Sequence, residues 1–266
     1  MMGTLPNVLS KRPHPAEHDL AGVIVDANGT SFSNGDEIIG FIPVCKSRPA
    51  APIFIPDAHP GMTALQSSSR QGALAQYATL PTDNVTPKPP KLSWEESAAL
   101  PLAALTAVQA LRLGGYDPAR ALGPAATSTP ANQESIFING GSTSIGIYAI
   151  QLAKALSLRV TASASARNES FVRGVGADTF VDYTARPLAE QLAVNPPDPR
   201  FGMVLDAAGS LDTALYVKSG AYVKKGGAYV TTGPWPDKGG WLGLMGRWTG
   251  AVLRPSFLGG VSTTWK

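Results

Sequence analysis

Short apolar runs alternate with segments of helical period along the second half of the chain. The expected strands cover residues 135–139, 158–163, 178–182, 203–206 and 228–232. The expected helices cover residues 145–156, 168–174 and 211–225. The first of these helices is expected to bury a stripe at helical spacing, formed by Ile145, Ala149, Leu152, Ala153 and Leu156. Strands that alternate with helices form β-α-β units, so the pattern predicts an α/β fold with a doubly wound, Rossmann-type parallel sheet.

The first half of the chain has a different pattern, typical of short antiparallel strands. Apolar runs separated by Gly, Asn and Asp turns predict strands at residues 20–26, 35–41 and 72–78. Residues 46–69 are rich in Pro and Ser, and we expect them to form a long surface loop. Strands of this kind predict part of a small β-barrel.

Two helices are expected between the halves. The first should begin after Ser93, because Ser93 and Glu96 have the spacing of a capping box. Pro101 should kink or divide it, since proline lacks the N–H that a helix interior requires. A second apolar helix is expected over residues 103–113, with a glycine stop after it. Residues 118–132 lack periodicity and are expected to form a loop.

The main candidate for a binding site is the glycine-rich turn that follows the strand at residues 135–139. A strand that turns into a helix aims the helix's free N–H groups and positive dipole end at the turn, which suits a pyrophosphate. The spacing is that of a dinucleotide fingerprint in which Thr143 replaces the middle glycine. The candidate residues are Gly141, Ser142, Thr143, Ser144, Ile145 and Gly146. A purely structural turn is the alternative, but the surrounding α/β pattern favours a nucleotide, because ligands bind beyond the carboxyl ends of the strands.

The next strand favours NADP(H) over NAD(H). An NAD site has an acidic residue about twenty positions beyond the glycine turn, where it bonds the ribose 2′-hydroxyl. Here the chain has Ser163, Ser165 and Arg167, and no carboxylate before Glu169. Hydroxyls and a guanidinium would hydrogen-bond a 2′-phosphate that a carboxylate would repel. The alternative is that these are ordinary polar residues at a strand end.

The composition excludes several classes of protein. The 266 residues carry a net charge of +3 without a Lys/Arg cluster, which argues against nucleic-acid binding. No run approaches the roughly 18 apolar residues of a membrane span. No secretory signal is visible, so we expect a soluble protein of the cytoplasm, with a mitochondrial location not excluded.

No metal site is expected. The single cysteine, Cys45, excludes a disulfide framework and a multi-cysteine zinc site. His14 and His18 are four residues apart, but Pro13 and Pro15 disfavour a helix there, and no third ligand is near.

Together these segments resemble the medium-chain dehydrogenase/reductase superfamily, in its zinc-independent quinone oxidoreductase and enoyl reductase branch of fungal type. The segments that carry the resemblance are residues 17–25, 35–41, 72–77, 98–107, 140–146, 176–178, 182–183 and 206–209. Each is short, but their order and spacing together are specific. The resemblance implies a GroES-like domain over residues 1–103 and a Rossmann NADP-binding domain over residues 104–266, with NADPH in the cleft.

The resemblance also implies roles for particular residues. The turn from Gly141 to Gly146 would hold the pyrophosphate, and Tyr183 would join Ser163, Ser165 and Arg167 around the 2′-phosphate. Thr106 matches a threonine near the nicotinamide. Residues 258–260 resemble a segment near the carboxamide, on a strand through which family members pair as homodimers. His18 matches a zinc ligand of the metal-dependent branch, but it lacks a suitable cysteine partner.

The implied activity is NADPH-dependent reduction of an activated C=C bond (an enoyl or enone substrate) or of a quinone. The proton donor is not identified. The chain departs from the family's length at both ends, where barrel strands and a late Rossmann segment are expected, so we expect a truncated member. A catalytically inactive cofactor-binding or partner-binding protein, for example one associated with a polyketide synthase, is therefore the alternative.

Overall fold

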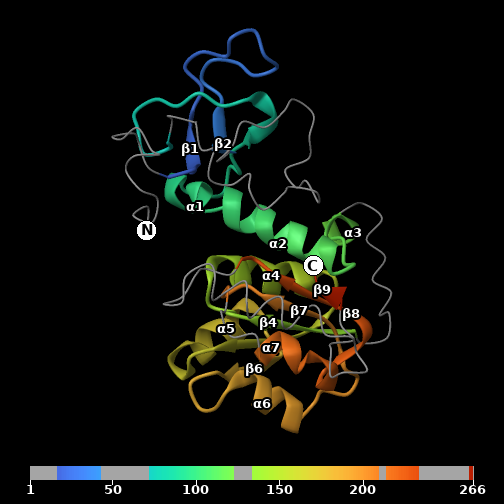
Figure 1. Ribbon diagram of the computed structural model, residues 1–266. Coiled ribbons are helices and arrows are strands. Elements are labelled where there is room, and N and C mark those ends of the chain that lie inside the picture. The colour runs from blue at the N-terminus through green and yellow to red at the C-terminus, as the bar shows by residue number, and fades with distance from the viewer. Residues whose placement is uncertain (1–16, 43–71, 123–133, 210–213, 234–263, 266) are drawn as a thin grey trace, which may run out of the picture. The chain divides into compact units, whose positions relative to one another are not determined.

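The computed structural model describes residues 17–42, 72–122, 134–209, 214–233 and 264–265. Contacts along the chain divide it into two compact units, Met1–Leu102 and Ala103–Lys266, which are described separately below. Figure 1 labels the helices and strands of both.

The first unit contains a three-stranded antiparallel sheet in the order β1-β2-β3. Its strands are β1 (Asp19–Val23), β2 (Glu37–Phe41) and β3 (Val85–Pro87), the last preceded by the 3₁₀ turn η1 (Thr82–Asn84). The strands pair with β2 in the centre, where Ile38 and Ile39 are buried. This confirms the expected antiparallel first half and two of its three predicted strands.

The prediction of a strand at residues 72–78 is wrong. This segment consists of bends and extended chain without ladder pairing, and it exposes Leu74 (72%) and Tyr77 (74%). The Ala75 N–H bonds back to the Ala73 carbonyl (2.9 Å), which folds the chain instead of extending it. Small apolar residues can show a strand pattern, but a strand forms only where a neighbour accepts its ladder bonds. The third strand is β3, whose Thr86 lies opposite Ile39.

The two helices that follow are as expected. Helix α1 (Trp94–Ala98) starts with a complete capping box, in which the Ser93 hydroxyl accepts from the Glu96 N–H (3.1 Å) and the Glu96 carboxylate accepts from the Ser93 N–H (2.9 Å). Pro101 divides the helices and is the first residue of α2 (Pro101–Leu113), where its missing N–H costs nothing. Gly115 follows with φ +93°, a left-handed conformation that ends the helix.

The expected loop at residues 118–132 is wrong in its first part. A short helix, α3 (Ala119–Leu122), forms there, and the Asp117 carboxylate accepts from the Ala119 N–H (3.2 Å). The acceptor side chain explains the helix start, because it satisfies an N–H that the helix itself leaves free. Residues 123–132 lie outside the described part of the chain.

The second unit is built on a six-stranded parallel sheet in the order β6-β5-β4-β7-β8-β9. Its strands are β4 (Ser135–Asn139), β5 (Arg159–Ala164), β6 (Thr179–Asp182), β7 (Phe201–Asp206), β8 (Val223–Thr231) and β9 (Thr264–Trp265). With β4 counted as the first strand, the order is 3-2-1-4-5-6, that of the dinucleotide-binding fold. The sheet grows outward from β4 in both directions, first through β5 to β6 and then through β7 to β9, so the direction of the connections reverses at β4.

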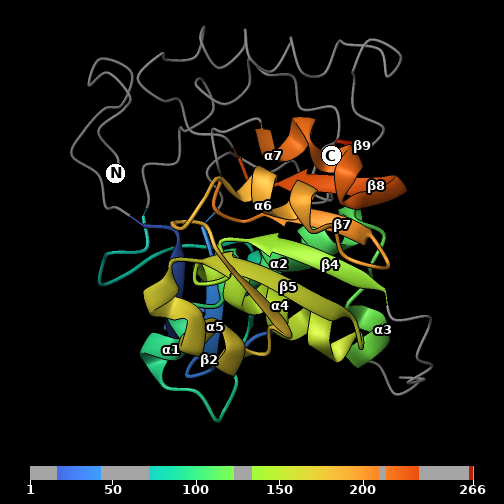
Figure 2. The same cartoon turned by 90° about the horizontal axis from the view of Figure 1, so that it is seen from below.

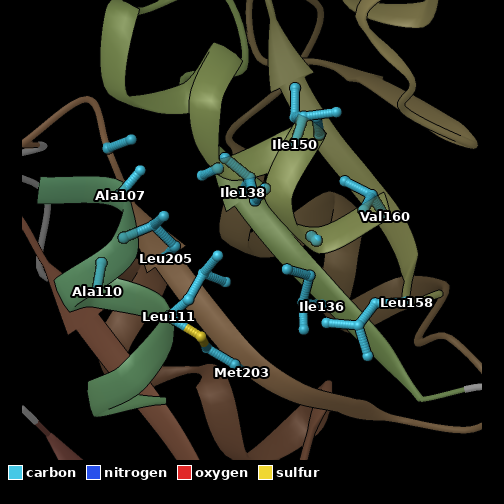
Figure 3. Close-up of a cluster of buried hydrophobic side chains, with 14 of the residues drawn as sticks. Ala107, Ala110, Leu111, Ile136, Ile138, Ile150, Leu158, Val160, Met203 and Leu205 are labelled. Carbon is cyan, nitrogen blue, oxygen red and sulfur yellow. The ribbon is translucent and has the colours of Figure 1, made fainter. Parts of the chain in front are cut away.

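Helices cover both faces of this sheet, as Figures 1 and 2 show. The helices that connect the strands are α4 (Ser144–Ala155), α5 (Glu169–Val175, after the 3₁₀ turn η2, Ala166–Asn168), α6 (Leu188–Val194) and α7 (Ala214–Val217, before the 3₁₀ turn η3, Ser219–Ala221). Successive residues of β4 point to opposite faces, so Ile136 and Ile138 pack with α4 and α2 whereas Phe137 packs with α6 and α7. Figure 3 shows the first of these cores. The doubly wound α/β prediction is confirmed.

Several helix predictions need correction. The helix expected over residues 211–225 is only partly right. Residues 214–217 form α7 and residues 219–221 form the turn η3, but the last three residues begin β8, where Val223 pairs with Phe201 and the Phe201 N–H bonds to the Tyr222 carbonyl (2.9 Å). Helix α6 was not predicted. Helix α5 ends at Gly176 (φ +125°), two residues beyond the predicted glycine.

The face that α4 buries is shifted from the predicted stripe. Ala149 and Ala153 are buried as expected, and Ile150 is buried with them. Ile145, Leu152 and Leu156 are only partly buried at the margin. The shift arises because Ile150 packs toward Gly141 and Gly176, a contact between distant residues that helical periodicity alone does not reveal.

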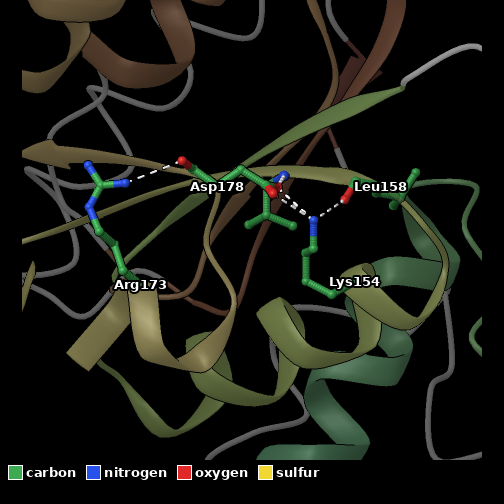
Figure 4. A network of polar contacts seen from close by, with 5 residues as sticks. Lys154, Leu158, Arg173 and Asp178 are labelled. Carbon is green, nitrogen blue, oxygen red and sulfur yellow. Dashed lines mark hydrogen bonds and ion pairs between the residues drawn. The ribbon is translucent and has the colours of Figure 1, made fainter. Parts of the chain in front are cut away.

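An ion pair ties α4 to β5 and β6, and it carries a prediction (Figure 4). The Asp178 carboxylate lies 2.8 Å from Lys154 Nζ and accepts from the Val160 N–H (2.7 Å). Partial burial would raise the pKa of Asp178, but the bonds from Lys154 and Val160 outweigh it and lower that pKa below its ordinary value of 3.8. A lowered folded-state pKa contributes stability above pH about 4, and this contribution is lost as the pH falls through the folded value.

Asp178→Asn is therefore expected to lower the free energy of unfolding at pH 7 by about 1 kcal/mol, a modest effect because both side chains are more than a third exposed. Urea unfolding at pH 7 and pH 3 measures it, and the difference from the unmodified protein should shrink at pH 3. Glu169→Gln, which removes the exposed pair of Glu169 with Arg173, is the matched control and should change stability by less. An equal loss at both pH values would contradict the electrostatic origin.

Candidate dinucleotide-binding site

The turn between β4 and α4 is built on main-chain bonds to the neighbouring strand. Gly140 has φ +87°, and the Gly140 and Gly141 N–H groups both donate to the Ser163 carbonyl of β5 (3.2 and 2.7 Å). The turn therefore lies at the carboxyl ends of β4 and β5, where the sheet order reverses. In α/β sheets this is the place where ligands bind.

Two glycines of the turn have no room for a side chain. A Cβ on Gly146 would lie 2.1 Å from the Gly140 carbonyl oxygen. A Cβ on Gly141 would lie 2.9 Å from Ala162 Cβ and 3.1 Å from Val172 Cγ1. Glycine at these positions lets α4 start directly against the strand. The packing fits the first and third glycines of a dinucleotide fingerprint.

Thr143, which replaces the middle glycine, is the N-cap of α4. Its hydroxyl accepts from the Gly146 N–H (3.0 Å) and donates to the Gly140 carbonyl (2.8 Å). Its hydroxyl therefore supports the turn from within. In the part of the chain that the structure describes, the N–H groups of Ser144 and Ile145 donate to no acceptor. Free N–H groups at a helix start suit the oxygens of a pyrophosphate.

A buried polar network lies directly under the turn. The Asn139 amide donates to the Asp206 carboxylate (2.8 Å) and accepts from the Ser163 hydroxyl (2.7 Å). Asp206 is 1% exposed and Ser163 is 0% exposed. The Ser163 hydroxyl also accepts from the Gly140 N–H (3.3 Å). The network ties the ends of β4, β5 and β7 together, and it places the Ser163 side chain inside the protein, not on the surface that Ser165 and Arg167 share.

The other predicted residues of the 2′-phosphate group gather beyond β5. Ser165 is half-buried, and the Tyr183 N–H bonds to the Ala164 carbonyl at the end of β5 (3.3 Å), with Tyr183 51% exposed. Arg167 is exposed, and its guanidinium has no hydrogen-bond or ion-pair partner among the described residues. The structure thus brings a hydroxyl, a free guanidinium and a tyrosine to one strand end.

Asn168 was missed by the sequence analysis. Its side-chain amide donates to the Ser142 hydroxyl (3.2 Å) and to the Ser165 hydroxyl (3.4 Å). It thereby connects the glycine turn to the end of β5. No local motif marks it, because both partners are defined by how the two strand ends come together.

A carboxylate lies near this group but is engaged locally. Asp182, the last residue of β6, accepts from the Thr184 hydroxyl (2.7 Å) and the Thr184 N–H (2.8 Å). The Thr184 hydroxyl and N–H bonds, with a weaker contribution from the Ala166 N–H, lower the pKa of Asp182. The carboxylate is thus held mainly by its own turn, and the Ala166 N–H beyond β5 also acts on it. The end of β5 itself carries no acidic residue.

The remaining predicted residues lie elsewhere. Thr106 is half-buried on α2, next to the buried Ala107, and nothing described places it beside the glycine turn. The His18 ring lies with Nδ1 2.9 Å from the Ile42 carbonyl. Within the described ranges no group of His, Cys, Asp and Glu could hold a metal ion, and no helix is long and apolar enough to cross a membrane. Cys45, His14 and residues 258–260 lie outside those ranges.

Comparisons with known proteins agree with this architecture, although no protein-family model matches the chain. A quinone-oxidoreductase homolog from Spinacia oleracea, described as chloroplastic, is 31% identical over 206 residues, which is 74% of this chain and 50% of the relative. A trans-enoyl reductase from Aspergillus terreus is 31% identical over 222 residues, covering 80% of this chain and 55% of the relative. Thus the chain spans about half the length of these curated relatives.

Among solved structures, the quinone oxidoreductase from Coxiella burnetii covers 83% of this chain and 56% of its own, with a TM-score of 0.59 and 23% identity. Fold and turn together define a Rossmann-type α/β unit, and the other unit contains a three-stranded antiparallel sheet. The chain thus resembles the medium-chain dehydrogenase/reductase superfamily, and its curated relatives include a quinone-oxidoreductase homolog and a trans-enoyl reductase. Members of this superfamily use nicotinamide cofactors.

Proposed function

We propose that this chain binds NADPH and acts as a reductase on an activated C=C bond or a quinone. The observation that carries the proposal is the turn from Gly141 to Gly146, where tightly packed glycines and free N–H groups form a cradle for a pyrophosphate. The names of the relatives supply the substrate classes, an enoyl group and a quinone.

The choice of NADPH is supported by the group beyond β5. A 2′-phosphate accepts hydrogen bonds and carries charge, so it matches the Ser165 hydroxyl, the free Arg167 guanidinium and the neighbouring Tyr183. The absence of an acidic residue at the end of β5 removes the partner that a ribose 2′-hydroxyl would need there. Ser163 takes a different role, since its hydroxyl holds the turn through Asn139.

Bound NADPH would supply a hydride, which adds to the electron-poor carbon of the acceptor while a proton completes the reduction. The residues of this chain bind and orient the cofactor, and Thr106 is proposed to lie near the nicotinamide. Proximity and orientation are the main contributions that such a scaffold makes to the rate. The chain's own proton donor is not assigned.

Turnover tests the proposal. NADPH oxidation is followed at 340 nm with a panel of trans-enoyl thioesters, enones and quinones, and product formation is confirmed by mass spectrometry. Reduction of one class, with NADPH preferred over NADH, is the expected result. Cofactor binding with no turnover on any acceptor would instead support an inactive cofactor-binding protein.

Two further properties belong to the proposal. A homodimer is expected from the family resemblance, and sedimentation equilibrium of the purified chain measures it. A cytoplasmic location is also proposed, while one relative is described as chloroplastic; imaging of a tagged chain decides between compartments.

A further inference from the structure

We infer that Asn168 makes the site selective for a phosphate by orienting two hydroxyl groups, those of Ser142 and Ser165, as hydrogen-bond donors. This inference rests on the proposed NADPH site and names the residue that would set its cofactor preference. Asn168 is a positioning residue here, because it acts through the two serines.

The contacts come from three separate segments. Ser142 lies in the turn before α4, Ser165 follows β5, and Asn168 ends the 3₁₀ turn η2. The Asn168 Nδ2 atom lies 3.2 Å from Ser142 Oγ and 3.4 Å from Ser165 Oγ. All three residues are partly exposed, so a ligand can reach the two hydroxyls.

The direction of these bonds decides what the hydroxyls can offer. A serine hydroxyl has one proton to donate and two lone pairs that accept. Here Asn168 donates to both oxygens, and neither hydroxyl proton has an acceptor among the residues that the structure describes. Each hydroxyl therefore keeps its proton for a ligand.

Only some ligands match two outward donors. A phosphate oxygen accepts hydrogen bonds and donates none at neutral pH, so two donors with a nearby guanidinium suit it. A ribose 2′-hydroxyl needs an acceptor as well, which is the role of the carboxylate in NAD sites. The arrangement thus favours the 2′-phosphate over the 2′-hydroxyl.

Asn168→Asp reverses the direction of the two hydrogen bonds with almost no change in the shape of the side chain. A carboxylate accepts from both serines, turns their protons inward and adds a negative charge beside the phosphate position. We expect NADPH to bind roughly 30-fold more weakly, since hydrogen bonds to charged groups are worth about 1.5–3 kcal/mol and tenfold in affinity is 1.4 kcal/mol. The affinity for NADH should change by less than about threefold.

The experiment measures dissociation constants for NADPH, NADH and 2′,5′-ADP by isothermal titration calorimetry, in the full chain and its variants. Asn195→Asp is the matched control, because it makes the same change of charge at an exposed position. Asn195 lies in the loop that leads to the amino end of β7, whereas the candidate site lies at the carboxyl ends of the strands. Asn168→Ala is the second variant. It removes the amide without adding charge, and it should weaken NADPH and 2′,5′-ADP binding while sparing NADH.

A preference for NADPH that falls only in the Asn168 variants supports the inference. Equal weakening of NADPH and NADH by Asn168→Asp and Asn168→Ala would overturn it, because Asn168 would then only support the turn. Unchanged binding in both variants, with NADPH bound normally by the unmodified chain, overturns the inference and leaves the proposed function intact. Failure of the unmodified chain to bind either dinucleotide or 2′,5′-ADP overturns the proposed function itself.

Discussion

Gly146→Ala is expected to remove cofactor binding and to destabilise the second unit by roughly 3 kcal/mol, near the upper end of single substitutions. The added Cβ would lie 2.1 Å from the Gly140 carbonyl oxygen, which is main chain and cannot swing away as a side chain can. The start of α4 would have to move away from β4. That movement would break the bonds of Thr143 to Gly140 and would displace the free N–H groups of Ser144 and Ile145.

The same chain provides a matched control. Gly174 lies within helix α5 and has no atom within 4 Å of an added Cβ. Gly174→Ala should therefore leave binding unchanged and raise stability by up to about 1 kcal/mol, because alanine favours a helix more than glycine does. Thermal unfolding and NADPH titration of both variants check the pair. Normal NADPH binding by Gly146→Ala would show that the turn does not hold the cofactor.

Asn139→Ala is expected to cost roughly 3 kcal/mol of folding free energy, because it removes one hydrogen-bond partner from each of two buried polar groups. Asp206 would lose its amide donor while remaining 1% exposed, and the Ser163 hydroxyl would lose its acceptor. Since this network lies beneath Gly140, NADPH affinity should fall together with stability.

Ser163→Ala tests the Ser163–Asn139 bond apart from the Asn139–Asp206 bond. It removes one hydroxyl and leaves the Asn139–Asp206 bond in place, so it should cost about 1 kcal/mol. Urea unfolding curves of the two variants give the comparison. A smaller loss for Asn139→Ala than for Ser163→Ala would mean that the buried carboxylate does not depend on Asn139.

The parts of the fold that the sequence predicted well depend on local chemistry. The capping box at Ser93 and Glu96, the break at Pro101 and the turn before α4 each follow from residues a few positions apart. Alternation of apolar runs predicted the parallel sheet for the same reason.

The errors arose where a distant partner decides the structure. Residues 72–78 have an apolar strand pattern but form no ladder with any residue that the structure describes, whereas β3 pairs with β2 across more than forty residues of sequence. The helix predicted over residues 211–225 includes the start of β8, because the pairing of Val223 with Phe201 is not visible in the local sequence. Within β8, Lys224 pairs with Glu134 (2.5 Å), which lies ninety residues earlier in the sequence.

In the candidate site, too, some residues are predictable from the local sequence and others are placed by distant partners. The residues of the glycine turn follow from one continuous segment, and the structure gives them the packing and free N–H groups that a dinucleotide needs. The polar group is different, because Ser163 turns inward to Asn139 and Asn168 joins Ser142 to Ser165. Which side of a strand end faces a ligand depends on the neighbouring strands.

One measurement tests the central claim, that this turn and the strand end beside it bind NADPH. The melting temperature of the purified chain is recorded with increasing NADPH and, separately, NADH, for the unmodified protein and for Arg167→Ala. A ligand that binds only the folded state stabilises it by about 2.7 kcal/mol at a hundred times its dissociation constant, so binding appears as a concentration-dependent shift. We expect a larger shift with NADPH than with NADH, reduced to the NADH level in Arg167→Ala. A folded chain whose melting temperature responds to neither cofactor, or equally to both with and without Arg167, would contradict it.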